Sequence, residues 1–208
     1  MVSELAMFPL GTVVLPYSLL PLHVFEPRYR ALVQAALADN SEFGTVLIER
    51  GSEVGGGDVR FGIGTRVRLV HCEQFPDGRY AIAVAGVGRL RIVEWLADDP
   101  FPRARVESID ERVGHGDVTR ARRVVEARVA AVHECWARLD PRFDATRWSP
   151  LDVDPVIASY ELCARGGLDG LDALRVLEAP DVGTRLELLA ELLADQLVLL
   201  RARLDGEG

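Results

Sequence analysis

The chain has 208 residues, of which 49% are hydrophobic and 27% are charged, and its formal net charge is −8. This composition is typical of a globular protein with a sizeable core and excludes an intrinsically disordered chain. The negative charge argues against a nucleic-acid partner, because that affinity comes largely from basic contacts that release counterions. All 24 basic residues are arginine, which excludes a P-loop lysine, a Schiff-base lysine and a Ser–Lys protease dyad.

The long uncharged stretch Leu5–Val24 contains three prolines and a histidine and is therefore a poor candidate for a membrane-spanning helix. The N-terminus lacks the basic leader and the small-residue cleavage site of a signal peptide. We therefore expect a cytoplasmic protein with no membrane partner. Cys72, Cys135 and Cys163 are odd in number and widely spaced, which predicts reduced, buried thiols rather than disulfides or a zinc site.

The first half of the chain is predicted to be rich in β-strands. Phe43–Ile48 is an apolar run long enough for a buried strand. Phe75–Gly78 is a strong turn signal, since proline pre-sets one turn position and glycine accepts a positive φ. Beyond it, large and small apolar residues alternate over Tyr80–Ala85, which is typical of a strand. We expect Gly86–Gly88 to break the strand or to form a bulge.

One helix is predicted within this β-rich half. It begins at Glu26–Pro27, because proline is favoured at the first helical position, where its missing N–H costs nothing. Its apolar stripe consists of Tyr29, Leu32, Val33 and Ala36. The proline-broken apolar segments before it, Phe8–Leu10 and Leu19–Phe25, should lie at sheet edges and could accept a peptide by strand addition. Alternatively, their side chains simply fill a barrel core.

The second half is predicted to be helical. Asp117 caps a long helix, and a second helix starts at Asp154–Pro155, runs to about Arg165 and ends at Gly166–Gly167. A short helix follows over Leu171–Leu177. The last helix is expected to begin with a capping box formed by Thr184 and Glu187. Its predicted apolar stripe consists of Leu186, Leu189, Leu193, Leu197, Leu200 and Leu204, broadened by Leu188, Leu192 and Leu199.

The change from strand-like to helical sequence patterns falls near residues 113–117. We therefore predict an α+β protein with a β-rich subdomain over residues 1–113 and an α-helical bundle over residues 117–205.

No recognisable catalytic or metal-binding pattern is found in the sequence. Gly62–Gly64 and Gly86–Gly88 lack the third glycine of a dinucleotide fingerprint and lie among predicted strands. No pair of histidines has the spacing of a metal-binding helix motif. A Cys–His dyad assembled from distant positions remains an open alternative, in which the chain would be a small-molecule enzyme.

Four arginines alternate with apolar residues on two predicted strands: Arg66, Arg68, Arg89 and Arg91. If they lie close together they would form a local basic patch. Alternation of this kind is more typical of the solvent face of a strand.

Several segments in order resemble the N-terminal, substrate-recognition domain of Lon proteases. The opening block is Phe8–Pro16 followed by Pro21–Tyr29. The later segments are Phe43–Val46, Gly62–Thr65, Pro76–Tyr80, Gly86–Ile92, Asp154–Ala164, Leu174–Ala179 and Thr184–Leu186. The resemblance covers roughly residues 5–204. Tyr17 stands where members of this family often have glycine, and Leu90 where they often have phenylalanine.

The resemblance implies a PUA-like β pseudobarrel with one inserted helix, followed by a helical bundle. It implies a non-catalytic module with no cofactor and no metal, since the ATPase and peptidase domains of full Lon proteases are missing from these 208 residues. Expected partners are unfolded or tagged proteins or peptides, and a separate Lon protease or a chaperone. Alternatives are RNA binding, by analogy with other PUA-like folds, and small-molecule binding.

If the chain has a binding site, we expect it at the seam between barrel and bundle. The candidate residues are Phe25, Glu26, Arg28 and Tyr29. The Glu26–Arg28 pair has an alternative interpretation as an ion pair that only anchors the start of the helix.

Overall fold

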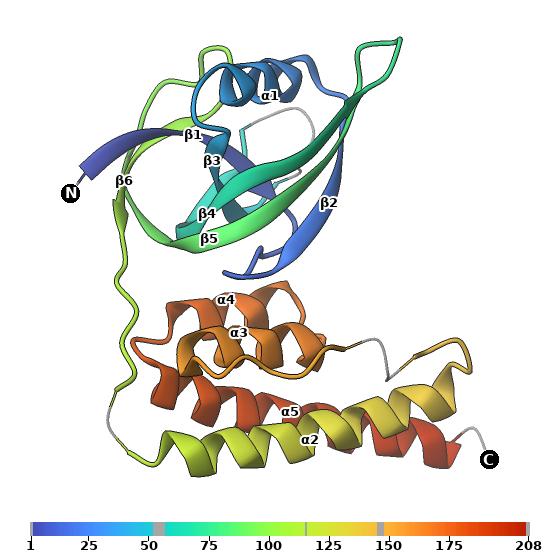
Figure 1. Ribbon diagram of the computed structural model, residues 1–208. Helices are drawn as coiled ribbons and strands as arrows, with labels where there is room; N and C mark the ends of the chain where they lie inside the picture. Colours follow the sequence, from blue (N-terminus) through green and yellow to red (C-terminus); the bar gives the residue numbers. More distant parts are fainter. Residues whose placement is uncertain (1, 52–56, 115, 145–147, 207–208) are drawn as a thin grey trace. The chain divides into compact units, whose positions relative to one another are not determined.

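The computed structural model describes residues 2–51, 57–114, 116–144 and 148–206 (Figure 1). The strands are β1 (Val2–Leu10), β2 (Leu19–Val24), β3 (Glu42–Arg50), β4 (Val59–Gln74), β5 (Tyr80–Trp95) and β6 (Arg103–Ser108). The helices are α1 (Pro27–Ala38), α2 (Val118–Leu139), α3 (Pro155–Gly166), α4 (Gly170–Glu178) and α5 (Val182–Gly206). The predicted α+β class, with one helix inserted among the strands, is confirmed.

The chain forms two compact units, each of which is described by itself. The first unit comprises Met1–Asp110 and Asp169–Leu177, so it contains all six strands, α1 and almost all of α4. The second unit comprises Glu111–Leu168 and Glu178–Gly208, with α2, α3 and α5.

Five strands of the first unit close into a barrel. The sheet order is β2-β5-β4-β3-β1-β6, and an additional pairing of β5 with β6 joins the two sides. β1 is parallel to β3, whereas the other pairings are antiparallel. The predicted bulge in β5 is present, since Arg66 pairs with Gly88 and Val67 with Gly86, which leaves Val87 unpaired with β4.

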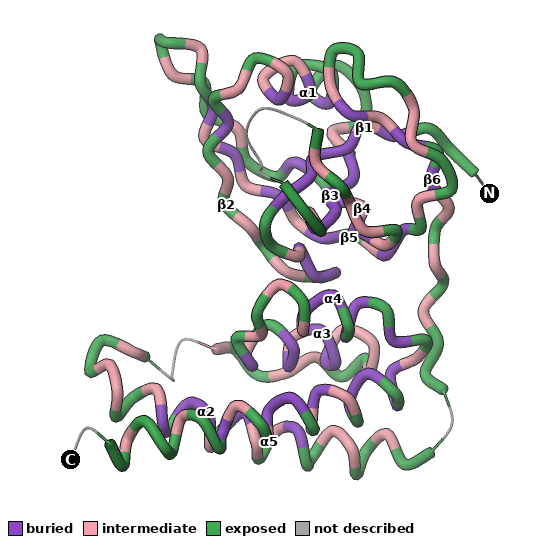
Figure 2. Tube along the Cα trace, turned by 180° about the vertical axis from the view of Figure 1, so that it is seen from behind, coloured by how far each residue is buried: buried purple, intermediate pink, exposed green. Residues whose placement is uncertain are grey.

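β2 lies at an edge of this sheet. Among the described strands it pairs with β5 alone, from Leu19 opposite Ala85 to Val24 opposite Tyr80. Exposed and intermediate residues alternate along it until the buried Val24 (Figure 2). The prediction that Leu19–Phe25 contributes an edge strand is therefore confirmed. The same prediction is wrong for Phe8–Leu10, because β1 lies between β3 and β6 and the Phe8 and Leu10 side chains are buried in the core.

Helix α1 packs its apolar stripe into the barrel core. Its buried residues are Tyr29, Leu32, Val33 and Ala36, as predicted. The Tyr29 ring stacks on Phe8 of β1, with ring centroids 4.1 Å apart and planes 9° apart. This stacking ties the first turn of the helix to the sheet beside β2.

The predicted position of Arg89 is wrong. Arg89 does not lie on a solvent face: it is buried, and its guanidinium donates to the Leu177 carbonyl of α4 at 3.0 Å. Arg66 and Arg68 both pair with Glu42, at 3.5 and 2.7 Å. Arg89 is therefore set apart by its burial, whereas Arg66 and Arg68 share the single carboxylate of Glu42 and Arg91 is exposed.

In the second unit the predicted N-terminal caps are present in α2 and α3, whereas the one predicted for α5 is not. Asp117 and Asp154 accept backbone N–H groups at the starts of α2 and α3, as predicted. The capping box at Thr184 is wrong, because α5 begins at Val182 and the Asp181 carboxylate accepts the Thr184 N–H at 2.8 Å. An aspartate at this position satisfies the first free N–H groups of the helix better than an internal threonine can.

The predicted apolar stripe of α5 is also too wide. Leu186, Leu189, Leu192 and Leu193 are buried, whereas Leu199 is 72% exposed. The end of the helix therefore packs on one side only. No helix among the described residues is long and apolar enough to span a membrane.

Candidate binding site at the β2 edge

The four predicted site residues all belong to the first unit, where β2 leads into α1. Phe25 follows β2 and is 54% exposed, whereas Tyr29 is only 3% exposed. Glu26 is the N-cap of α1, and its carboxylate pairs with the Arg28 guanidinium at 3.1 Å. Arg28 also lies over the Tyr29 ring, 4.4 Å from its centroid. The Glu26–Arg28 ion pair at the helix start is therefore present, and it holds one face of Tyr29.

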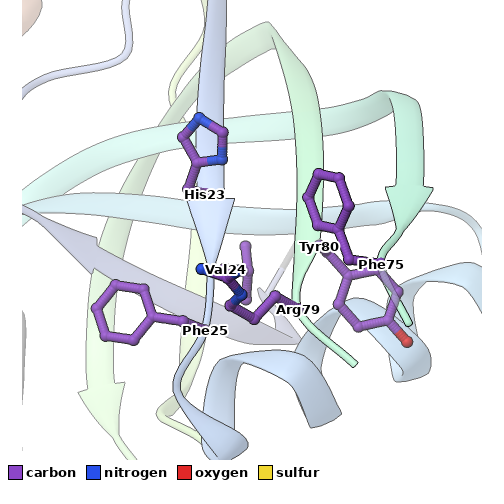
Figure 3. A pocket seen from close by; sticks show the side chains of 6 residues that line it. All are labelled: His23, Val24, Phe25, Phe75, Arg79 and Tyr80. Atoms are coloured by element: carbon purple, nitrogen blue, oxygen red, sulfur yellow. The ribbon is translucent and has the colours of Figure 1, made fainter. Parts of the chain in front are cut away.

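An apolar pocket of about 300 Å³, here called the outer pocket, lies beside the end of β2 (Figure 3). It is lined by His23, Val24, Phe25, Phe75, Arg79 and Tyr80. Its walls come from β2, from Phe25 and from the turn between β4 and β5. The pairing of Val24 with Tyr80 brings these segments together. A pocket of this size with mainly aromatic and aliphatic walls suits one large apolar side chain.

A second pocket of about 60 Å³, the inner pocket, shares His23, Val24 and Phe25 with the outer one. Its other lining residues are Phe8, Leu10, Leu22, Glu26 and Tyr29. The Tyr29 hydroxyl has no hydrogen-bond partner among the residues that the structure describes. Burial raises the pKa of this hydroxyl to about 12, so at neutral pH it stays protonated and can donate a hydrogen bond.

Replacing Tyr29 by phenylalanine should raise the free energy of unfolding by about 1 kcal/mol, because a buried hydroxyl without a partner costs about that much. The stacking on Phe8 would be kept. Guanidinium denaturation followed by circular dichroism measures the change. Tyr80→Phe is the matched control and should be destabilising, since the Tyr80 hydroxyl accepts from Gln34 at 3.2 Å. A destabilised Tyr29→Phe variant would contradict the prediction.

Cys135 and Cys163 are buried, as predicted, whereas Cys72 is partly exposed, and neither Cys72 nor Cys163 has the environment of a nucleophile. Burial raises the pKa of the Cys163 thiol to about 12, and burial also raises the pKa of Cys72. Both therefore remain thiols at neutral pH, whereas a nucleophilic cysteine needs a lowered pKa. Among the described residues, no group of three or more His, Cys, Asp or Glu side chains could hold a metal ion. His115 lies outside the described residues.

Two larger pockets lie in the second unit, with volumes of about 340 and 460 Å³. Their linings contain more charged side chains, among them Asp117, Arg120, Arg122 and Glu126. Arg122 and Glu126 already pair with each other at 2.8 Å. We therefore regard the β2 edge, with its apolar pocket beside open backbone, as the stronger candidate for a binding site.

Sequence reasoning missed the residues that the β4–β5 turn contributes to the outer pocket. Phe75, Arg79 and Tyr80 flank the Pro76–Gly78 turn, which is visible in the sequence. Their position beside Phe25 depends on the pairing of β2 with the start of β5, and no local pattern reveals that pairing.

The sequence is similar to a known protein family and to several of its members. Residues 4–195 match the family model of the ATP-dependent protease La (LON) substrate-binding domain. The chain is 36% identical over 102 residues to a Lon protease of Dictyoglomus thermophilum, covering 49% of this chain and 13% of that protein. It is 28% identical over 203 residues to a Lon protease of Heliobacterium modesticaldum, covering 96% of this chain and 25% of that protein. The chain thus spans a quarter or less of the length of these two relatives.

Solved structures show the same fold. A Lon N-terminal domain protein from Xanthomonas campestris superposes with a TM-score of 0.65 at 24% identity, covering 92% of this chain and 98% of that one. The N-terminal domain of a Mycobacterium avium complex Lon protease gives a TM-score of 0.60 at 20% identity, covering 93% and 99%. Because the family model matches nearly the whole chain, this protein belongs to the family of the Lon substrate-binding domain.

Proposed function

We propose that this chain is a non-catalytic module that binds unfolded segments of other proteins at the β2 edge. The observation that carries the proposal is the outer pocket, an apolar cavity beside an open sheet edge in a member of a substrate-binding family. Phe25 and Leu19, at 54% and 70% exposure, extend the apolar surface along the edge. An unfolded chain offers the complementary features, since its large apolar side chains and its main chain are both accessible.

The absence of lysine from the sequence supports a non-catalytic role, because neither a Walker-type ATPase nor a Ser–Lys peptidase can be built from these residues. In this role the module would present or hold unfolded or tagged segments for a separate Lon protease or a chaperone. A pull-down from native lysate, read by mass spectrometry, tests that part of the proposal. Recovery of background proteins alone would argue against a protease or chaperone partner.

Replacing Phe25 by alanine should weaken binding to an unfolded model protein about tenfold, since an aromatic side chain beside a pocket is a typical hot spot. Isothermal titration with reduced, carboxymethylated lactalbumin measures the dissociation constant. Stability should hardly change, because the Phe25 side chain is largely exposed.

Leu199→Ala is the matched control, since Leu199 is an exposed apolar residue of the second unit. It should bind the unfolded protein as the unaltered chain does. Equal affinity of the Phe25→Ala and Leu199→Ala variants would remove the β2 edge from the proposal. No detectable binding by the unaltered chain at high concentration would overturn the proposed function itself.

A further inference from the structure

We infer that the bound segment adds to the sheet as an extra β-strand along the free edge of β2. This inference rests on the proposed function and specifies how the segment is held. The recognition would be made by main-chain hydrogen bonds, and the outer pocket would select one side chain of the segment.

The hydrogen-bond pattern of β2 shows which of its backbone groups face outward. Both backbone groups of Gly86 bond toward the start of β2: its N–H donates to the Ser18 carbonyl and its carbonyl accepts from the Tyr17 N–H, each at 2.9 Å. The position opposite Ser18 is therefore a hydrogen-bonding position of the ladder. Antiparallel pairs alternate between hydrogen-bonded and non-hydrogen-bonded, and the register of β2 with β5 is continuous. Leu20, Leu22 and Val24 therefore bond to β5.

The intervening residues, Leu19, Pro21 and His23, turn their backbone groups to the free edge. This edge offers three carbonyl acceptors but only two N–H donors, because proline has no N–H. Pro21 lies where a proline is tolerated in a sheet, on the unpaired side of an edge strand. It also limits uncontrolled pairing, so the edge can accept a short segment without acting as a template for aggregation.

The side chains near the edge specify the chemistry of the segment. His23 lies on β2 and also lines the outer pocket, so the pocket opens beside one of the outward-facing backbone groups. A large apolar side chain of the added strand would enter it. Arg79 lines the same pocket and pairs with the Asp77 carboxylate at 2.7 Å. The Arg79 backbone N–H, the Arg79 guanidinium and, least of all, Arg30 lower the pKa of that carboxyl.

Arg79 and Asp77 of the β4–β5 turn form an ion pair, and the Arg30 guanidinium lies beside Gly78 of the same turn, so this turn next to the outer pocket has one more positive than negative charge among the three residues. We conclude that the preferred occupant is an extended segment of an unfolded protein in which a carboxylate lies next to the apolar residue. Charge complementarity of this kind adds specificity at the rim, whereas the main-chain hydrogen bonds are common to all sequences.

Amide hydrogen exchange, resolved by residue with NMR, tests the inference on the full chain. The probe is a capped peptide of about ten alternating valine and serine residues with one central phenylalanine and one aspartate beside it. At saturation, the Leu19 and His23 amides should exchange at least about tenfold more slowly, because they gain hydrogen bonds. The Leu20 and Leu22 amides already bond to β5 and should change little.

Variants of β2 separate the main-chain contribution from the side-chain contribution. His23→Pro removes an outward donor, whereas His23→Ala keeps the N–H and removes only the side chain that lines the pocket. The His23→Pro variant should bind the probe about fivefold more weakly than the His23→Ala variant, and this difference measures the main-chain contribution. Pro21→Ala adds a donor and should tighten binding about threefold. If the His23→Pro variant fails to fold, the probe is changed instead. N-methylation of alternate residues of the probe removes the N–H groups that would donate to the outward carbonyls of β2, and it should weaken binding likewise.

Three results would overturn the inference. Chemical-shift changes at Phe25 and Phe75 without slower amide exchange at Leu19 and His23 would show that the probe binds only through a side chain in the outer pocket. That result would refute strand addition and leave the proposed function intact. Equal affinity for probes with lysine and with aspartate beside the phenylalanine would refute the preference for a carboxylate. No binding of the probe or of any unfolded protein would overturn the proposed function together with the inference.

Discussion

Replacing Arg185 by methionine should lower the free energy of unfolding by about 3–5 kcal/mol, because it breaks a buried ionic network at its centre. The Arg185 side chain is fully buried. It donates to the Glu111 carboxylate and to the Ser159 hydroxyl, both at 2.8 Å, and lies 3.8 Å from the Tyr160 ring centroid. The Tyr160 hydroxyl donates to the same carboxylate at 2.7 Å. Without the guanidinium, the partly buried carboxylate of Glu111 would lose its counter-charge.

Guanidinium denaturation of the full chain, followed by tryptophan fluorescence and circular dichroism, measures this loss. Tyr160→Phe is a milder companion that removes one hydrogen bond to a charged group and should cost about 1.5–3 kcal/mol. The double variant Arg185→Met, Glu111→Leu should be more stable than the sum of the two single changes predicts, since it leaves no isolated charge. An Arg185→Met variant within about 1 kcal/mol of the unaltered chain would show that the network adds little.

Replacing Gly86 by alanine should cost about 2–3 kcal/mol, because the added methyl group meets backbone that cannot move aside. A Cβ at Gly86 would lie 2.2 Å from the Leu15 carbonyl oxygen and 2.9 Å from the Pro16 Cα. Gly86 also holds the entry to β2, since its carbonyl accepts from the Tyr17 N–H at 2.9 Å. We therefore expect weaker binding of unfolded protein in addition to lower stability.

Gly88→Ala is the matched control from the same bulge, because a Cβ at Gly88 meets nothing within 4 Å. Its stability should stay within about 0.5 kcal/mol of the unaltered chain. Thermal melts and titrations of both variants give the comparison. Equal stability and equal affinity of the two alanine variants would show that the close approach of the Leu15 backbone to Gly86 does not determine the conformation at the start of β2.

The turn that Gly86 supports also contains a residue with an unusual backbone conformation. Tyr17 has a φ of 61°, in the left-handed region that glycine adopts without a steric penalty. Tyr17 adopts this conformation although it is not glycine, and the hydrogen bond from the Tyr17 N–H to the Gly86 carbonyl contributes to holding the turn.

The sequence by itself determined the elements whose signals are local. Proline at the first helical position placed the starts of α1 and α3, and Gly167, with a φ of 63°, ended α3 where predicted. The alternation over Tyr80–Ala85 predicted a strand, and β5 begins at Tyr80. These features follow from φ restrictions, free backbone N–H groups and side-chain periodicity, all of which act within a few residues. For the candidate site, they also placed Phe25 and Glu26 at the junction of β2 and α1.

Only the tertiary structure decided which distant residues meet. Arg185 and Glu111 are separated by 74 residues, and Arg89 becomes buried because its guanidinium reaches α4, 88 residues further along the chain. The outer pocket exists because β2 pairs with the start of β5 and so brings Phe25 to the β4–β5 turn. Strand register and barrel closure determine which of these distant residues come into contact. The contacts are between residues far apart in the sequence, so no local pattern encodes them.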